Sequence, residues 1–585
     1  MKPRFALLLA AACWGCGQAA PTADPAATLR QLLATAAEEG LRTSVAAQLR
    51  AGRTIEHLPL GDLAEKEAAA ELARSLLHGL AGIPRDRLSE SDLVSAELLE
   101  WVLDGAVESP KYHWLSLASI TPYQSPLTND LLLLGRDLPI GTPAERDRLA
   151  ARLTDIGPLV DSIRSGLEVR ASKGIRVPRP EVEQILGTLR ALRTPGLGSP
   201  YAPAAARIAS VPDSARPAFV AAVTAAVDQS INPALGRLIG YLAGDYLAAA
   251  PTTVGLAQYP GGEAYYRFLA ARNTTLDRRP EDIHQTGLAY LAQLEHSMDS
   301  LLAVIGFTGT RREFQAAMGR DPRLLARTPE EVGARYQKYY EAIKPHLGTL
   351  FLREPKAPAE FRRLDPRLEA ASTYGFYQPP SPASPVGIYF YNASNLRERN
   401  LASVGTIAFH ELVPGHHFQI ALAMENDSLP PFRREFNANA FAEGWAEYAS
   451  SLAGELGMYA DPYDAYGRLI SEAFLTTRLV VDPGMNLLGW SRDSAMAFMR
   501  AHTMMAESEI RSETLRYSVD LPGQALGYKV GALEFHRLRR HAAEALGDRF
   551  DVRAFHALLL DAGSLPMAVV ERMVDRWIAR VRAGG

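Results

Sequence analysis

Three histidines and a glutamate fall within eight residues of this 585-residue chain. The stretch reads His410-Glu411-Leu412-Val413-Pro414-Gly415-His416-His417, and a second glutamate opens the sequence Glu443-Gly444-Trp445-Ala446. Two imidazoles and a carboxylate are the ligands of many catalytic zinc ions, whose fourth position is left to water. A glutamate beside the first histidine is where such hydrolases carry their general base. The pattern predicts a zinc-dependent hydrolase with one zinc ion per chain, in which Glu411 is the base.

The spacing of the histidines differs from the usual zinc motif, in which they are four residues apart on one helix face. Here His416 and His417 follow His410 by six and seven residues. On an unbroken helix His417 would lie ~10 Å along the axis from His410, which is too far for one ion to bind both. Pro414 and Gly415 can distort the helix between them. We therefore expect a locally widened helix that brings His416 into place, with His417 as the alternative ligand.

The third ligand is expected to be Glu443. Glu447 lies one turn further along the same helix face and competes with it for this role. The carboxylate that does not bind the metal would orient a ligand or hold a water molecule. The alternative interpretation is that the motif binds no metal, in which case His416 and His417 would be ordinary surface histidines on a kinked helix.

The rest of the chain is expected to be mainly α-helical. Composition is that of an ordinary globular protein, with 47% hydrophobic and 22% charged residues and a net charge of -4, and no basic domain indicates nucleic-acid binding. One strand, at 387–392, is predicted to form a small sheet beside the motif helix. Apolar residues recur at helical spacing in eight stretches: 26–51, 61–80, 144–171, 180–193, 215–249, 261–305, 329–350 and 523–547.

The first residues predict export. Residues 1–20 read as a signal and the start of a tether, because a basic start is followed by a short apolar run and then by Cys13 and Cys16, either of which could carry a lipid. No later apolar run is long enough for a transmembrane helix. We expect an exported lipoprotein of the periplasm or cell envelope that meets the membrane only through this anchor. A helical N-terminal region (21–360) and a catalytic region (361–585) are expected to form one continuous fold with a cleft.

The motifs of the second half resemble those of a known family. Besides the two metal motifs, the resemblance rests on 387–392, 429–434, 478–482, 489–491 and 522–531, and it covers 380–540. On these residues the chain resembles the bacterial domain-of-unknown-function 885 family. That family is similar in design to the helical gluzincin peptidases, whose folds are helical ellipsoids with a deep central cleft. One departure from the family pattern is Asn486, where a histidine is usual.

The resemblance implies roles for individual residues. His410, His416 and Glu443 would bind zinc. The strand at 387–392 would border the cleft, where an extended peptide could add as a neighbouring strand, and Tyr389 and Tyr391 would contact it.

Two residues of a later helix complete the expected site. The similarity to the helical peptidases, in which a tyrosine of a later helix has this role, makes Tyr528 the candidate donor to the developing oxyanion, and Gln524, one turn earlier, is expected to contact substrate. Lys529 is a weaker candidate for a substrate carboxylate, since it points ~100° away from Tyr528. The expected substrate is a short peptide. The competing hypotheses are a zinc hydrolase of another amide or ester, and a non-catalytic lipoprotein that binds peptides.

Overall fold

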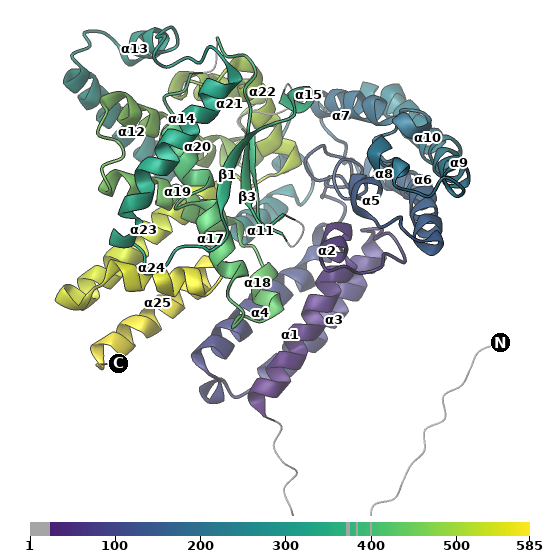
Figure 1. The fold of residues 1–585 in the computed structure, drawn as a ribbon, viewed down its shortest axis with the longest axis horizontal. Helices are drawn as coiled ribbons and strands as arrows, with labels where there is room; N and C mark the ends of the chain where they lie inside the picture. Colours follow the sequence, from purple (N-terminus) through teal and green to yellow (C-terminus); the bar gives the residue numbers. More distant parts are fainter. Residues whose placement is uncertain (1–23, 370–374, 382–383, 398–399, 585) are drawn as a thin grey trace, which may run out of the picture.

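The computed structural model describes residues 24–369, 375–381, 384–397 and 400–584. Over these residues the protein is mainly α-helical with one small sheet, as predicted (Figure 1). No helix among them is long and apolar enough to cross a membrane. Cys13 and Cys16, the expected lipidation sites, lie outside the described residues.

Helices build the first half of the chain, and each predicted helical stretch in it contains at least one of them. Most run along the right-hand side of Figure 1. Their bounds are α1 (Pro25–Arg42), α2 (Val45–Arg50), α3 (Leu63–Ala81), α4 (Glu90–Glu108), α5 (Leu132–Asp137), α6 (Pro143–Ser172), α7 (Arg179–Leu192), α8 (Ala205–Ala209), α9 (Arg216–Ala225), α10 (Asn232–Tyr241), α11 (Gly262–Thr274), α12 (Pro280–Ile305), α13 (Arg311–Met318) and α14 (Pro329–Ile343).

The second half carries the sheet and the motif helices. Its elements are β1 (Ala359–Arg363), α15 (Pro366–Glu369), β2 (Gly375–Gln378), β3 (Gly387–Tyr391), α16 (Val404–Glu411), α17 (His416–Met424), α18 (Pro431–Glu435), α19 (Asn439–Glu455), α20 (Pro462–Asn486), α21 (Arg492–His502), α22 (Glu507–Leu515), α23 (Leu526–Leu546), α24 (Val552–Asp561) and α25 (Met567–Arg582).

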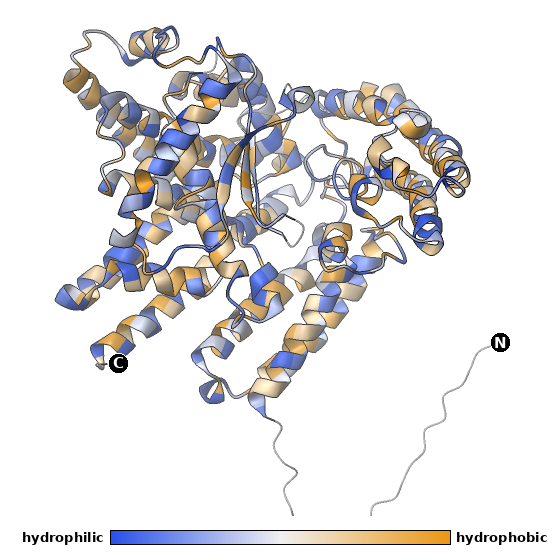
Figure 2. Ribbon diagram, viewed as in Figure 1, coloured by the Kyte–Doolittle hydropathy of each residue, from blue (hydrophilic) through white to orange (hydrophobic). Residues whose placement is uncertain are grey.

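Local sequence explains where several helices begin and end. Thr142 and Glu145 form a capping box at the start of α6, in which each side chain accepts from the other residue's backbone N–H. The stretch 261–305, predicted as one helical run, is divided into α11 and α12. Thr275 ends α11 in a left-handed conformation (φ 56°), and Pro280 begins α12. Figure 2 shows hydrophobic and hydrophilic residues alternating along such helices, as expected when one face packs inward.

The sheet has the strand order β1-β3-β2. β3, the strand predicted from the sequence, lies in the middle: it pairs in parallel with β1 and antiparallel with β2. Both of its edges are therefore occupied by the chain itself. A substrate peptide cannot add beside β3 as the sequence analysis expected, because its backbone groups are already paired on both sides.

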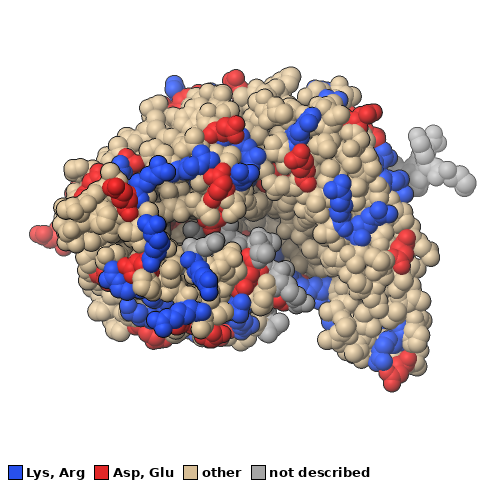
Figure 3. Space-filling model, turned by 90° about the horizontal axis from the view of Figure 1, so that it is seen from above, with Lys and Arg blue, Asp and Glu red and all other residues tan. Residues whose placement is uncertain are grey.

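The hydrophobic cores join distant parts of the chain. The largest core combines side chains from 45–266 with others from 481–525, and the second combines 94–98 and 326–351 with 389–578. The expected boundary near residue 360 falls inside β1 and does not separate these cores. Figure 3 shows a hollow in the face seen from above, with positive and negative side chains interspersed around it.

Candidate metal centre and active site

The two histidines of the motif lie on two separate helices. α16 ends at Glu411, and α17 begins at His416. The chain reverses through a four-residue turn that contains a cis bond between Val413 and Pro414. This corrects the expected widened helix: the helix is fully interrupted. The break has the same consequence as the expected bulge, because it shortens the path from His410 to His416.

Gly415 makes this tight turn possible. A side-chain carbon at this position would lie 1.8 Å from the carbonyl oxygen of His410, so no other residue fits without displacing the backbone. The turn is held from the other side by Trp445, whose indole N–H donates to the carbonyl of Pro414 (2.9 Å). Trp445 is fully buried. The tryptophan of the second motif thus fixes the turn of the first.

His410, His416 and Glu443 meet at one point. The Nε2 atoms of His410 and His416 lie 3.7 and 3.3 Å from Oε2 of Glu443. One ligand atom from each residue lies within 4.8 Å of the other two. Ligands at ~2.1 Å from a tetrahedral zinc ion would be ~3.4 Å apart. The donor types and their separations therefore fit a zinc ion, and the side chains remain 14 to 20% exposed, which leaves room for a further ligand.

His417, the alternative ligand, points elsewhere. Its Nδ1 is hydrogen-bonded to the hydroxyl of Tyr377 (2.9 Å) and its Nε2 to the carbonyl of Ala357 (3.0 Å). Both ring nitrogens are therefore engaged at the sheet, and the side chain is buried. His416 is the histidine that the fold directs toward His410 and Glu443.

Glu447, the competing carboxylate, belongs to a buried charge network behind the cluster. Arg468 bridges Glu447 (2.9 Å) and Glu472 (3.3 Å), and Lys529 forms an ion pair with Glu472. The hydroxyl of Tyr290 also donates to Glu472 (2.8 Å). The ammonium of Lys529 is thus paired with Glu472, which argues against its binding a substrate carboxylate.

Two glycines bring α19 and α23 into close contact. A side-chain carbon on Gly444 would lie 2.5 Å from the Cα of Gly531, so both positions need glycine. Glu443 precedes the first glycine, and Tyr528 lies one turn before the second. The Tyr528 ring stacks parallel to that of His410 at 6.4 Å between centroids. The contact therefore places the candidate oxyanion donor beside the candidate metal ligands.

The cluster and the candidate base perturb one another electrostatically. Burial would raise the pKa of Glu443, but hydrogen bonds from His410 and His416 outweigh it and hold that pKa well below its usual range. Burial would lower the pKa of His416, and the Glu443 carboxylate reverses this and raises it. The pKa of Glu411 is raised by burial, with Glu443 adding to the effect and the two imidazoles opposing it. A raised pKa suits a carboxylate that must take up a proton.

Two arginines flank Tyr528: Arg478, which is buried, and Arg516, which is partly buried. The guanidinium of Arg478 lies over its ring at 4.5 Å. Burial raises the pKa of Tyr528, the Glu443 carboxylate adds to this, and Arg516 and Arg478 oppose it. The hydroxyl therefore keeps its proton at neutral pH and can act as a donor.

The expected substrate contacts divide into two groups. Gln524 lies in the turn before α23 and not on the helix of Tyr528 as expected; it lines a cavity, with its amide bonded to Asn439 (2.9 Å) and to Arg516 (2.8 Å). Tyr389 and Tyr391 instead belong to the core, where both pack against Tyr336 of α14. Tyr389 is 0% exposed, so the structure corrects the expectation that these tyrosines contact substrate.

Tyr377 lies near the site but could not be recognised from the sequence. Tyr377 of β2 lies close enough to Glu411 for that carboxylate to contribute to its raised pKa, after burial. Its strand, β2, is only four residues long and carries too weak a pattern to be recognised in the sequence. Asn486, the departure from the family pattern, is fully buried and accepts a hydrogen bond from the N–H of Leu256 (3.1 Å), so it supports the cavity wall without facing the cluster.

Residues 46–574 match the model of the family described as "Bacterial protein of unknown function (DUF885)". The chain belongs to the DUF885 family. The match includes most of the N-terminal half, for which the sequence analysis found only a helical pattern. The first half is therefore part of the same family unit as the motifs.

Two solved structures share the DUF885 protein's fold. A "putative lipoprotein from Colwellia psychrerythraea" is 25% identical with a TM-score of 0.86, and the alignment covers 96% of this chain and 100% of that one. A "putative lipoprotein of unknown function from Shewanella oneidensis" is 16% identical with a TM-score of 0.72, covering 94% and 100%. No curated protein matches the chain. Neither description states an activity, so the activity must be argued from the site.

Proposed function

We propose that this DUF885 protein is a zinc-dependent hydrolase, and specifically a metallopeptidase that cleaves short peptides. The observation that carries the proposal is the convergence of His410, His416 and Glu443 with Glu411 directly beside the first histidine. A purely structural ion-pair network pairs the basic and acidic side chains of the protein with each other. At this site, in contrast, two imidazoles and a carboxylate converge with a partly open side, which is the donor set and geometry of a catalytic zinc site.

His410, His416 and Glu443 would hold the zinc ion. When bound there, zinc supplies Lewis acidity that lowers the pKa of a water molecule toward ~7 and polarises a carbonyl. Glu411 would accept a proton from the attacking water and return it to the leaving amine. Tyr528 would donate a hydrogen bond from its hydroxyl to the developing oxyanion. Arg478 and Arg516 would hold the Tyr528 ring in place for this.

We also propose that the protein is an exported lipoprotein. The support is the apolar N-terminus with Cys13 and Cys16, together with the two structural relatives, which are themselves described as lipoproteins. Labelling of the expressed protein with a radioactive or clickable fatty acid tests this: incorporation should disappear in either Cys13→Ser or Cys16→Ser, and absence of labelling in the wild type would refute it.

Metal content and activity test the hydrolase together. We expect about one zinc ion per chain by mass spectrometry in the purified protein, and its loss in His410→Ala. Glu411→Gln should keep the zinc and lower kcat on a peptide library by about 10²–10⁴-fold, the usual contribution of a general base. Asp427→Asn, at a fully exposed position, is the matched control.

Each outcome tests a different part of the proposal. Absence of zinc from wild-type protein after reconstitution would refute the metal centre. Zinc retained without hydrolysis of any peptide would refute the peptidase, and a screen of other amides and esters would then follow. Hydrolysis undiminished in Glu411→Gln would refute the role of that base.

A further inference from the structure

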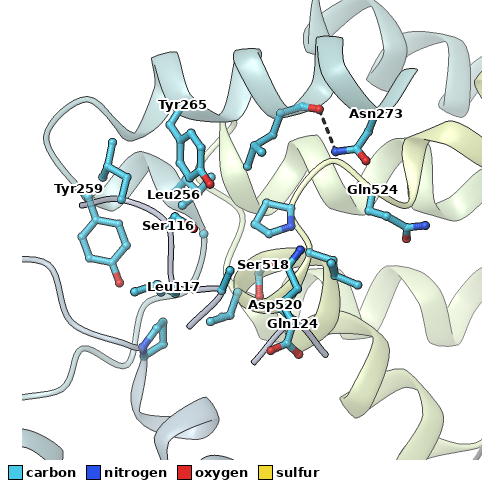
Figure 4. A pocket seen from close by; sticks show the side chains of 18 of the residues that line it. Ser116, Leu117, Gln124, Leu256, Tyr259, Tyr265, Asn273, Ser518, Asp520 and Gln524 are labelled. Carbon is cyan, nitrogen blue, oxygen red and sulfur yellow. Dashed lines mark hydrogen bonds between the residues drawn. The ribbon is translucent and has the colours of Figure 1, made fainter. Parts of the chain in front are cut away.

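A cavity of about 270 Å³ is lined in part by Asn439, which lies one helical turn before Glu443 on α19. Three stretches far apart in the sequence supply most of its lining, with Pro178 and Asn439 completing it (Figure 4): 115–124, 255–273 and 518–524. Pockets for small ligands in proteins usually measure about 300–1,000 Å³. The cavity is therefore of a size for a small ligand or for the end of a longer one.

The position of the cavity relates it to the cluster. Asn439 and Gln524 line it and are bonded to each other through Nε2 of Gln524 and Oδ1 of Asn439 (2.9 Å). Asn439 is the first residue of α19 and lies one helical turn, about 6 Å along the axis, before Glu443. Gln524 lies in the turn that precedes α23. Because an extended peptide advances ~3.3 Å per residue, the spacing on α19 corresponds to about two peptide residues.

Its lining is made of amides, hydroxyls and apolar groups, with a single carboxyl. Side-chain amides come from Gln124, Gln258 and Asn273 as well as from Asn439 and Gln524. No lysine, arginine or histidine is among the described residues that line it, and Asp520 is its one acidic residue. Amide groups both donate and accept, which suits the N–H and C=O groups of a peptide backbone.

Asp520 has no cationic partner. It is 5% exposed, its Oδ1 forms no hydrogen bond within the described residues, and neither it nor the neighbouring buried Glu181 forms an ion pair there. Arg516 is bonded to Glu513 and Gln524 instead (3.2 and 2.8 Å). A buried carboxyl without a cation is costly to ionise, and its environment favours an incoming positive charge.

The charges around Asp520 support this reading. Burial raises its pKa to about 8, the Glu181 carboxyl adds to this, and Arg516 and the Thr121 hydroxyl oppose it. Glu181 is raised to a pKa of about 7, first by burial, with Arg492 opposing. The guanidinium of Arg492 itself donates to Thr514 and to the carbonyl of Arg511. Positive charge near the two carboxyls is therefore insufficient to hold both ionised.

We propose that this cavity binds the free amino end of a short peptide substrate, with its ammonium group at Asp520 and about two residues between that group and the scissile bond. The proposal rests on the proposed peptidase function and adds the end of the peptide that is recognised. A carboxyl terminus fits less well, because no basic side chain among the described residues lines the cavity. The amides of Asn439 and Gln524 would bind the backbone as it passes toward the cluster.

Peptide binding to the zinc-loaded full chain tests the proposal. The base variant Glu411→Gln keeps the peptides intact, so calorimetry can compare tetra-alanine with its N-acetylated and C-amidated forms. We expect acetylation to weaken binding at least 10-fold and amidation to change it less than twofold. Adding Asp520→Asn should abolish the preference for the free amine, and adding Asp493→Asn, at an exposed position, should leave it intact.

A second variant guards against a folding defect in Asp520→Asn. Gln124 is exposed and lines the cavity, so Gln124→Trp should narrow it without disturbing the core. We expect it to weaken binding of all three peptides. Equal binding of free and acetylated peptides, or a larger loss on amidation than on acetylation, would overturn the proposal. Tight binding of an N-acetylated peptide that begins with lysine would also overturn it, by identifying a side-chain ammonium as the recognised group.

The two proposals fail in different ways. If the wild type cleaves peptides but ignores the state of their amino end, the cavity proposal is overturned and the peptidase remains. If free-amine binding depends on Asp520 but the wild type cleaves no peptide, the cavity proposal is supported and the peptidase is refuted.

Discussion

Adjacent turns of α19 and α23 carry two clusters of charged groups that differ in how their charges are balanced. Glu443 faces His410 and His416 at a partly exposed site. Glu447, one turn later, lies with Lys529 in a buried network whose cations and anions pair with each other. The same residue type on the same helix face therefore has two different partners.

The balance of charges, and not the residue type, distinguishes the candidate metal site from the structural ion-pair network. The network pairs two basic side chains with two carboxylates, and pairing of this kind ties α19, α20 and α23 together at a desolvation cost. The cluster offers converging donors without a lysine or arginine of its own among them. Such an arrangement is typical of groups that act on something other than one another.

Replacing glutamate by glutamine on each of the two turns of α19 should have the largest and most different effects. Glu443→Gln should lower zinc affinity by ~100-fold or more, since losing even a group that only orients a metal ligand costs about 10–100-fold. Glu447→Gln should keep the zinc and lower the free energy of unfolding by about 3–5 kcal/mol, because Arg468 loses a buried partner. Zinc titration and urea unfolding measure the two effects. Zinc loss in Glu447→Gln with zinc retained in Glu443→Gln would reverse the two roles.

Tyrosines next to the two clusters provide a second, smaller contrast. Tyr528→Phe should lower kcat by about 10²–10³-fold with zinc content unchanged, as loss of an oxyanion donor does. Tyr290→Phe removes the hydroxyl that donates to Glu472 and should cost about 1 kcal/mol of stability with little effect on kcat. Steady-state kinetics and thermal melting decide. A kcat for Tyr528→Phe within twofold of the wild type would exclude Tyr528 from the reaction.

Asp520 and Glu181 form a third arrangement, in which two buried carboxyls form no ion pair with a basic side chain among the described residues. Its contribution to stability should therefore depend on pH. Their pKa values are raised to about 8 and about 7, above those of the unfolded chain near 4. The folded protein therefore holds protons that the unfolded chain has lost, so this stabilisation is full below pH ~4 and decreases until pH ~8. We expect Asp520→Asn to gain stability relative to the wild type between pH 5 and 8.5, on the order of 3 kcal/mol. Urea unfolding at both pH values tests it, and a constant difference would contradict it.

Residue types and spacing reduced the candidate ligands to His410, either His416 or His417, and either Glu443 or Glu447, and the family resemblance favoured Glu443. The fold brings His410, His416 and Glu443 together. The distance between His410 and His416 predicted a distortion of the helix at Pro414 and Gly415, which was expected to be a local widening; the helix is interrupted there instead. The form of the interruption could not be predicted, because it depends on contacts from elsewhere, such as the hydrogen bond from Trp445 to Pro414.

The strand residues show the limit of pattern reading. The strand predicted at 387–392 is observed at 387–391, but its neighbours β1 and β2 are short, and their pairing is non-local. Without them β3 looked like an open edge, and Tyr389 looked available to a ligand. The cavity of Asp520 could not be predicted either, because the residues that line it come from distant parts of the sequence and meet only in the folded chain.

The contact between Gly444 and Gly531 has a consequence for how the chain can change over time. Two helices that touch backbone to backbone are at their minimum separation, so any variation there can only move them apart. Even one added methyl group would push Glu443 away from the opposite wall that carries Tyr528. Because neither glycine has a side chain that could be made smaller, mutation at these two positions can widen the site but cannot narrow it.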